Sequence, residues 1–72
     1  MDSVVDARGL SCPQPVLMTM DEIKKVEKGE ISVLVDTDTS KENVSRAAES
    51  RGWLVKDVKP DGIGYRVTIS KD

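Results

Sequence analysis

The chain lacks the covalent and metal cross-links that hold many small folds together. Its 72 residues include one cysteine and no histidine, so neither an internal disulfide nor a zinc or iron–sulfur site can be assembled from its own side chains. A chain of this length is near the lower size at which hydrophobic burial alone supports folding. We therefore expect a single domain over residues 1–72. Because the chain contains no phenylalanine, we expect its core to be aliphatic.

Glycine and proline positions divide the sequence into six predicted elements. Gly29 is expected to end the first helix in the left-handed conformation, and "PDGIG" to form the turn between the last two strands. Thr39 and Glu42 are predicted to form a capping box at the start of the second helix. The predicted strands cover residues 3–6, 30–36, 53–58 and 65–70, and the predicted helices cover residues 13–28 and about 39–51.

The order strand, helix, strand, helix, strand, strand predicts an α+β fold, a two-layer βαβαββ sandwich. Short connections favour a parallel pairing of the first two strands through a right-handed crossover, and a hairpin for the last two. Two amphipathic helices are enough to cover one face of a four-stranded mixed sheet. The other face is therefore expected to be open to solvent or to a partner.

The single thiol lies in the stretch "GLSCPQPVLM". Proline is favoured at the first helical position, so Cys12 before Pro13 is predicted at the helix N-cap, with Pro15 still inside the first turn. Unpaired backbone N–H groups and the helix dipole favour a thiolate there. The dipole contributes ~0.3–1 kcal/mol, which lowers the thiol pKa by less than one unit. Arg8, before the Gly9 turn, adds a favourable charge if its side chain folds back toward the sulfur.

A free cysteine is more often a small buried apolar residue than a reactive one. Here the predicted N-cap position is normally exposed, and Ser, Thr, Asp or Asn would cap the helix better than Cys12 does. The sequence therefore favours a functional thiol. Without a second thiol in the chain, Cys12 cannot complete a dithiol redox cycle. It can accept a sulfur atom as a persulfide and pass it to another protein, which requires partners but no cofactor.

An alternative is a regulatory or adaptor module in which Cys12 is kept only for shape. In either case Met18 is a candidate for partner docking, because methionine side chains adapt to different surfaces. The balance of 11 basic and 13 acidic residues gives no reason to expect direct nucleic-acid or membrane binding. With one cysteine and no recognisable signal segment, a reducing cytoplasm is the expected location.

The segment "DTDTSKE" has acidic and hydroxyl side chains at alternating positions, as in a calcium-binding loop. Lys41 occupies the place that needs glycine, and Ala47 the place that needs the closing glutamate. No metal site is therefore predicted. Asp36 and Asp38 are instead expected to end a strand and to place negative charge at the start of the second helix.

The stretch "LSCPQPV", with "DARG" before it and "GYRVTI" near the end, resembles the CPxP motif region of the TusA or SirA-like sulfur-carrier family. The resemblance implies strand order 1-2-4-3 with the fourth strand antiparallel. It also implies that Cys12 receives persulfide sulfur from a cysteine desulfurase and passes it to an acceptor, as in tRNA thiolation, molybdenum-cofactor synthesis or related sulfur and selenium metabolism. Pro13 and Pro15 would shape the helix start, with Arg8 and Gly9 supporting the site.

The stretch "KENVSRAAESRGW" is similar to the N-terminal domain of YedF-type proteins. The resemblance implies that such chains continue into a DsrE-like domain, whereas this sequence ends at Asp72. It leaves open whether the chain is a stand-alone relative or part of a longer protein, and whether the acceptor is a separate DsrE-like protein or an attached domain.

Overall fold

In a computed structural model, residues 2–10 and 14–71 are described, and they form the six predicted elements in the predicted order. The elements are β1 (Asp2–Asp6), α1 (Gln14–Val26), β2 (Gly29–Val35), α2 (Asp38–Ser50), β3 (Leu54–Asp61) and β4 (Gly64–Lys71).

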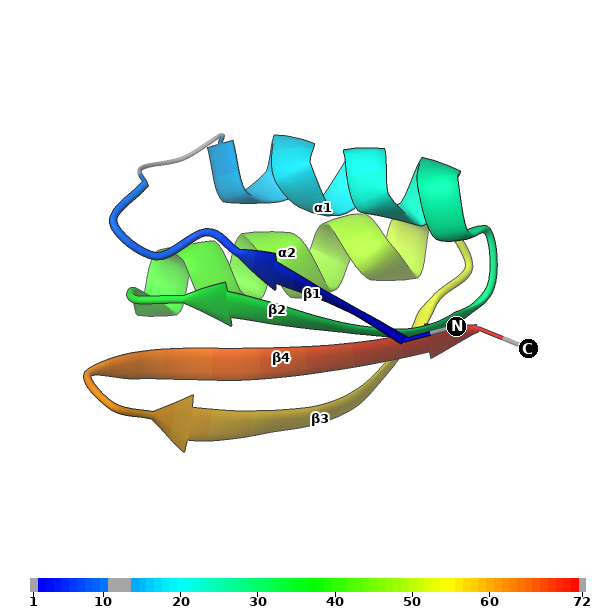
Figure 1. Cartoon of the computed structure of the whole chain (residues 1–72). Helices are drawn as coiled ribbons and strands as arrows, with labels where there is room; N and C mark the ends of the chain where they lie inside the picture. The colour runs from blue at the N-terminus through cyan, green and yellow to red at the C-terminus, as the bar shows by residue number, and fades with distance from the viewer. Residues whose placement is uncertain (1, 11–13, 72) are drawn as a thin grey trace.

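The four strands form one mixed sheet in the order β1-β2-β4-β3, and both helices lie on the same side of it (Figure 1). β1 pairs in parallel with β2, whereas β4 runs antiparallel to both of its neighbours, β2 and β3. The predicted α+β class, strand order and orientation of the fourth strand are all confirmed. The central position of β2 explains its nearly continuous apolar sequence, since both of its edges are paired.

The core lies between the sheet and the two helices, and it is aliphatic as expected except for Trp53. Each helix buries residues spaced four apart: Pro15, Thr19 and Ile23 in α1, and Ser40, Val44 and Ala48 in α2. The inner face of the sheet contributes residues from alternate positions, because successive side chains of a strand point to opposite faces. These are Val5, Ile31, Val33, Val35, Val67 and Ile69. Burying each valine or isoleucine contributes about 1.5–3 kcal/mol.

The predicted end of the first helix is wrong by two residues. α1 ends at Val26, and Glu27, not Gly29, takes the left-handed conformation that ends it, with φ 65°. The Glu27 backbone N–H still donates to the Ile23 carbonyl at 2.9 Å. Gly29 also has positive φ, 115°, but it is already the first residue of β2. The chain therefore turns into the sheet earlier than the glycine suggested.

The predicted capping box of the second helix is also wrong by two residues. The N-cap is Thr37, whose Oγ1 accepts a hydrogen bond from the Ser40 backbone N–H at 3.1 Å. β2 ends at Val35 and α2 begins at Asp38, so Thr37 and not Thr39 lies at the cap. Asp38 lies in the first turn of α2, where its negative charge interacts favourably with the helix dipole, as predicted.

The last two strands form the expected hairpin with a tighter turn than predicted. β3 continues through Pro60 to Asp61, so only Gly62, with φ 65°, and Ile63 connect it to β4. Pro60 is tolerated because β3 is an edge strand, where a missing N–H need not remove a ladder hydrogen bond.

Trp53 closes the core between α2 and β3. It is 2% exposed, and its backbone N–H donates to the Ala48 carbonyl at 3.0 Å. Its Nε1 is buried without a hydrogen-bond partner in the described part of the chain. Such an unpaired group costs about 1–3 kcal/mol, which the burial of the large ring offsets.

Gly64 allows the first residues of β4 to pack against the end of β2. A Cβ atom at this position would clash with the Val35 carbonyl oxygen and lie 2.7 Å from the Asp36 Cα. Both are backbone atoms, so a side chain here would push β4 away from β2.

We therefore expect Gly64→Ala to lower the free energy of unfolding by about 1–3 kcal/mol, the usual cost of overpacking. Urea denaturation followed by Trp53 fluorescence measures this. Ile63→Ala is the matched control, because Ile63 is 96% exposed in the same turn and should change stability by less than about 0.5 kcal/mol. Equal stability of the two variants would contradict the close packing at Gly64.

Candidate functional site

The predicted thiol, Cys12, and Pro13 lie outside the described residues, in the segment 11–13 that joins Leu10 to Gln14. We call this the cysteine segment. The candidate site is therefore described by the two structures that flank it, the turn after β1 and the start of α1.

The turn before the cysteine segment is held to the sheet by backbone hydrogen bonds. The Ala7 N–H donates to the Leu34 carbonyl at 2.9 Å, which continues the pairing of β1 with β2. The Leu10 N–H then donates to the Ala7 carbonyl at 3.4 Å, closing a four-residue turn. Gly9 occupies the third position with φ 78°, the conformation that a type II turn requires there and that favours glycine. Gly9 is thus a structural requirement of the turn.

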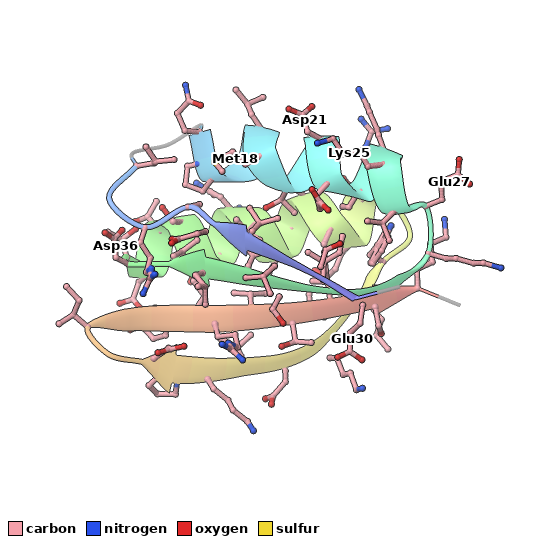
Figure 2. The ribbon with its side chains drawn as sticks, viewed as in Figure 1. Met18, Asp21, Lys25, Glu27, Glu30 and Asp36 are labelled. Atoms are coloured by element: carbon pink, nitrogen blue, oxygen red, sulfur yellow. The ribbon has the colours of Figure 1, made fainter. Side chains whose placement is uncertain are left out.

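Asp36 fixes this turn from a distant part of the sequence. Its Oδ2 accepts a hydrogen bond from the Gly9 N–H at 2.7 Å, across 27 residues. Figure 2 shows Asp36 at the end of β2, on the side of the molecule where the chain leaves β1. From sequence, Asp36 was expected to end a strand and to charge the entry to the second helix, and its contact with Gly9 was not predicted. The available signal was parallel pairing, which brings the carboxyl ends of β1 and β2 together.

Arg8 is bound by Asp6, two residues before it. The guanidinium donates from Nε to Asp6 Oδ1 and from Nη2 to Oδ2, both at 2.9 Å, and the Arg8 backbone N–H adds a bond of 3.2 Å to Oδ1. These hydrogen bonds from Arg8 lower the pKa of Asp6 to about 2. The Asp6 carboxylate in turn raises the pKa of Arg8, with smaller contributions from Asp61 and Asp36. The guanidinium is thus paired with a carboxylate, and the supporting role of Arg8 at the sulfur stays a prediction.

The start of α1 is held on the other side of the cysteine segment. Pro15 is fully buried in the first turn of the described helix, and its carbonyl accepts a hydrogen bond from the buried Thr19 Oγ1 at 2.8 Å. Gln14 is exposed, and the first turn of α1 contains no acidic residue. The positive end of the helix dipole is therefore not neutralised by a carboxylate from this turn.

Met18, the predicted docking residue, is half-buried and packs against the core cluster. It also lines a pocket between α1 and β1, so part of its surface stays accessible. Its role in docking stays a prediction.

A second polar cluster begins two residues beyond Asp36, and the sequence analysis did not anticipate it. Lys41 Nζ lies 3.4 Å from Asp38 Oδ1 and 4.5 Å from the centre of the Tyr65 ring. Hydrogen bonds from Tyr65 and then Lys41 lower the pKa of Asp38, and the same bond to Asp38 raises the pKa of Tyr65. This cluster ties the start of α2 to β4 beside the strand end that carries Asp36.

Fold and flanks together define a small two-layer α+β protein in which a single cysteine separates an anchored turn from a helix start. Residues 3–71 match the family model described as sulfurtransferase TusA. The chain belongs to this family of sulfur carriers.

Relatives and a solved structure agree with this assignment. The chain is 34% identical over 71 residues to the Escherichia coli protein named "Putative sulfur carrier protein YedF", covering 97% of this chain and 92% of that protein. It is 40% identical over 63 residues to the Aquifex aeolicus protein named "Putative sulfur carrier protein". A SirA-like protein from Desulfitobacterium hafniense has a crystal structure that matches with a TM-score of 0.86 and 31% identity, over 94% of this chain and 95% of that one.

The lengths of the relatives revise one expectation. The resemblance had implied that YedF-type proteins continue into a second domain. The chain spans 92% of the Escherichia coli YedF protein, so that relative has no second domain of similar size. By contrast, the match to the Aquifex aeolicus relative covers 85% of this chain but only 32% of that protein, so this chain spans about a third of that relative's length. Within the described residues, no helix is long and apolar enough to cross a membrane.

Removing the Asp36 carboxylate should loosen the turn before the cysteine segment. We expect Asp36→Ala to lower the free energy of unfolding by about 1 kcal/mol, the typical net value of one hydrogen bond. It should also speed hydrogen exchange at the Gly9 amide. Asp36→Asn keeps an acceptor oxygen and should restore most of the protection. Exchange measured by NMR at Gly9 and, as a reference, at core amides of β2 decides this. An unchanged Gly9 rate in Asp36→Ala would contradict the anchoring role.

The Asp6–Arg8 pair should make stability depend on pH at the acid end. Because the pKa of Asp6 in the folded protein, about 2, lies below its ordinary value of 3.8, the pair's contribution is present above about pH 4 and is lost as the pH falls toward 2. In Arg8→Met, the pKa of Asp6 should return toward 3.8, as measured by NMR titration of its carboxyl carbon. Arg46→Met, an exposed arginine on α2, is the control and should leave the pKa of Asp6 low. A low pKa in both variants would mean that Arg8 is not the cause.

Proposed function

We propose that the protein carries sulfur as a persulfide on Cys12, between a cysteine desulfurase and an acceptor protein. The observation that carries this proposal is the family match over residues 3–71, combined with a single cysteine in the chain. The described flanks support it. The turn at Gly9 is anchored by Asp36, and the first turn of α1 holds no carboxylate that would compete for the helix dipole.

The chemistry needs no oxidant and no cofactor. In the loading step, the Cys12 thiolate attacks the outer sulfur of the donor's cysteine persulfide. A new S–S bond forms on Cys12, the donor's S–S bond breaks, and the donor cysteine leaves as a thiolate. In the unloading step, an acceptor thiolate attacks the outer sulfur on Cys12, and the Cys12 thiolate leaves. Each cycle returns the carrier to its starting state.

The lone thiol explains why such a protein depends on partners. With no resolving cysteine in the chain, the persulfide of Cys12 cannot be discharged within the molecule, so a donor and an acceptor must each reach the sulfur. The proposed donor is a cysteine desulfurase, and a DsrE-like protein is the proposed acceptor. The pathways that fit are tRNA thiolation, molybdenum-cofactor synthesis and related sulfur or selenium metabolism. A reducing cytoplasm would keep the free thiol available.

To test the proposal, the protein is incubated with a cysteine desulfurase and cysteine and then weighed intact by mass spectrometry. We expect the mass to increase by that of one sulfur atom. The added sulfur should map to the peptide containing Cys12, and a reductant should remove it. Absence of the label with several desulfurases would count against the carrier function.

The variant Cys12→Ser separates the carrier from the adaptor alternative. Serine is an equal or better N-cap than cysteine, so the fold should persist, as circular dichroism can verify. A carrier loses all sulfur transfer to the acceptor in this variant, whereas an adaptor keeps its biological activity. Full activity of Cys12→Ser in a cell lacking the natural protein would overturn the proposed function.

A further inference from the structure

The two edges of the sheet are built differently. The β3 edge carries three features that discourage another strand from pairing: a register irregularity between Val55 and Asp57, Pro60 within the strand, and the lysines 56 and 59. The β1 edge has none of them within Asp2–Asp6, whose sequence is DSVVD. Val4, at its centre, is 66% exposed. One edge is thus protected against strand addition and the other is available for it.

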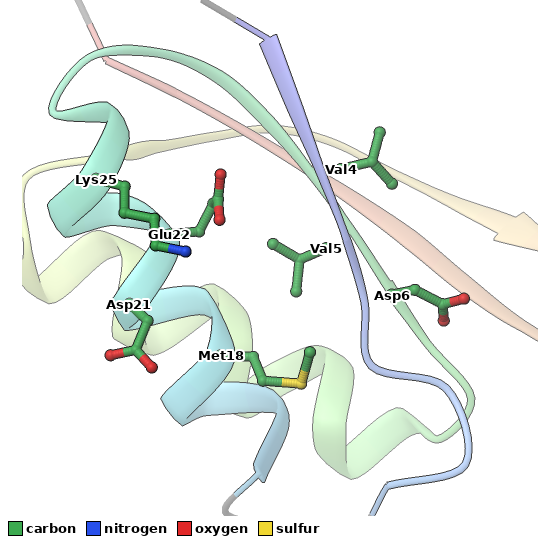
Figure 3. A pocket seen from close by; sticks show the side chains of 7 residues that line it. All are labelled: Val4, Val5, Asp6, Met18, Asp21, Glu22 and Lys25. Carbon is green, nitrogen blue, oxygen red and sulfur yellow. The ribbon is translucent and has the colours of Figure 1, made fainter.

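A pocket of about 260 Å³ runs along this available edge. Three consecutive residues of β1 line it, namely Val4, Val5 and Asp6, so it follows the strand edge instead of lying on one face of the sheet. Figure 3 shows Val5 pointing from β1 toward α1, and Met18 pointing from α1 toward β1. We call this feature the β1 groove. Its lining is completed by Met18, Asp21, Glu22 and Lys25 of α1.

The lining of the β1 groove selects for a long cationic side chain. Its floor is aliphatic, from Val5 and Met18, while Asp21 and Glu22 place carboxylates on the α1 side. The Asp6 carboxylate is already paired with Arg8, so two carboxylates and the ammonium group of Lys25 remain among the lining residues. A lysine or arginine of a partner can cover such a floor with its methylene groups and keep its charge at the rim. The volume is below the ~300–1,000 Å³ typical of small-molecule sites, so a single side chain fits better than a metabolite.

We propose that the β1 groove binds an extended segment of a partner protein. The segment adds to the sheet as a further strand beside β1 and places a lysine or arginine in the pocket between β1 and α1. In this mode of recognition, main-chain hydrogen bonds supply affinity and a pocket for alternate side chains supplies specificity. The inference goes beyond the proposed sulfur transfer and does not use the thiol, because every residue it names lies in β1 or α1.

A second copy of the same chain does not fit this edge. If two β1 strands paired, neither would bring a basic side chain to the other's pocket, because DSVVD contains no lysine or arginine. The β1 groove therefore favours a basic partner segment over a second copy.

The test uses two capped heptapeptides as probes, Thr-Val-Thr-Lys-Thr-Val-Thr and the same sequence with glutamate in place of lysine. They are titrated into the isotope-labelled protein, and amide shifts are followed by NMR. We expect the lysine peptide to shift the amides of residues 3–6 and of Met18, and the glutamate peptide to bind roughly tenfold more weakly. In the double variant Asp21→Lys, Glu22→Lys, the preference should reverse in favour of the glutamate peptide.

The control is Glu42→Lys, Glu49→Lys, which makes the same change in net charge on exposed positions of α2 and should keep the preference for the lysine peptide. Shifts confined to β3, no shift at millimolar peptide, equal binding of the two peptides, or a reversal in the control as well would each overturn the proposal. Repeating the titration with Cys12→Ser should give the same result, so failure here is distinguishable from failure of the sulfur-carrier function.

Discussion

The parallel pairing of β1 with β2 is the constraint on which the candidate site depends. In this register Asp6 lies opposite Leu34, so the carboxyl ends of both strands lie side by side. The chain therefore leaves β1 beside the end of β2. Only that arrangement lets Asp36 reach the Gly9 N–H. β4 begins beside the end of β2, because Gly64 packs against the backbone of Val35 and Asp36. The turn that leads into the cysteine segment is thus fixed by two strands distant from it in sequence.

Most of the architecture could be predicted from sequence because it follows from local patterns. Alternation and helical spacing located all six elements, and connection lengths fixed the crossover and the hairpin. The errors lie at element boundaries, which are the least well determined part of such a prediction. Glu27 takes the left-handed conformation at the end of α1, and Thr37 caps α2. A non-glycine residue with positive φ is uncommon, so local propensity favoured Gly29 over Glu27.

The candidate site was predictable only for the residues near the motif in sequence. Gly9 was singled out correctly as the turn residue, because its neighbours already required a reversal of the chain. Asp36 was missed, since its partner lies 27 residues away and a carboxylate at the end of a strand has many possible roles. Sequence left open where the Arg8 side chain points, and in the structure it is bound by Asp6, two residues before it. The supporting role of Arg8 at the sulfur stays a prediction.

The pairing of Arg8 with Asp6 also bears on how a thiolate at the start of α1 would be stabilised. With the guanidinium occupied, the helix dipole and the backbone N–H groups remain as local sources of positive potential, and the dipole contributes ~0.3–1 kcal/mol. That is less than one pKa unit, so a thiol at the predicted N-cap would be moderately activated and not strongly acidic. A thiol of this kind can be both nucleophile and leaving group, since nucleophilicity falls as the pKa falls. A carrier needs both properties, because it must accept sulfur and then release it.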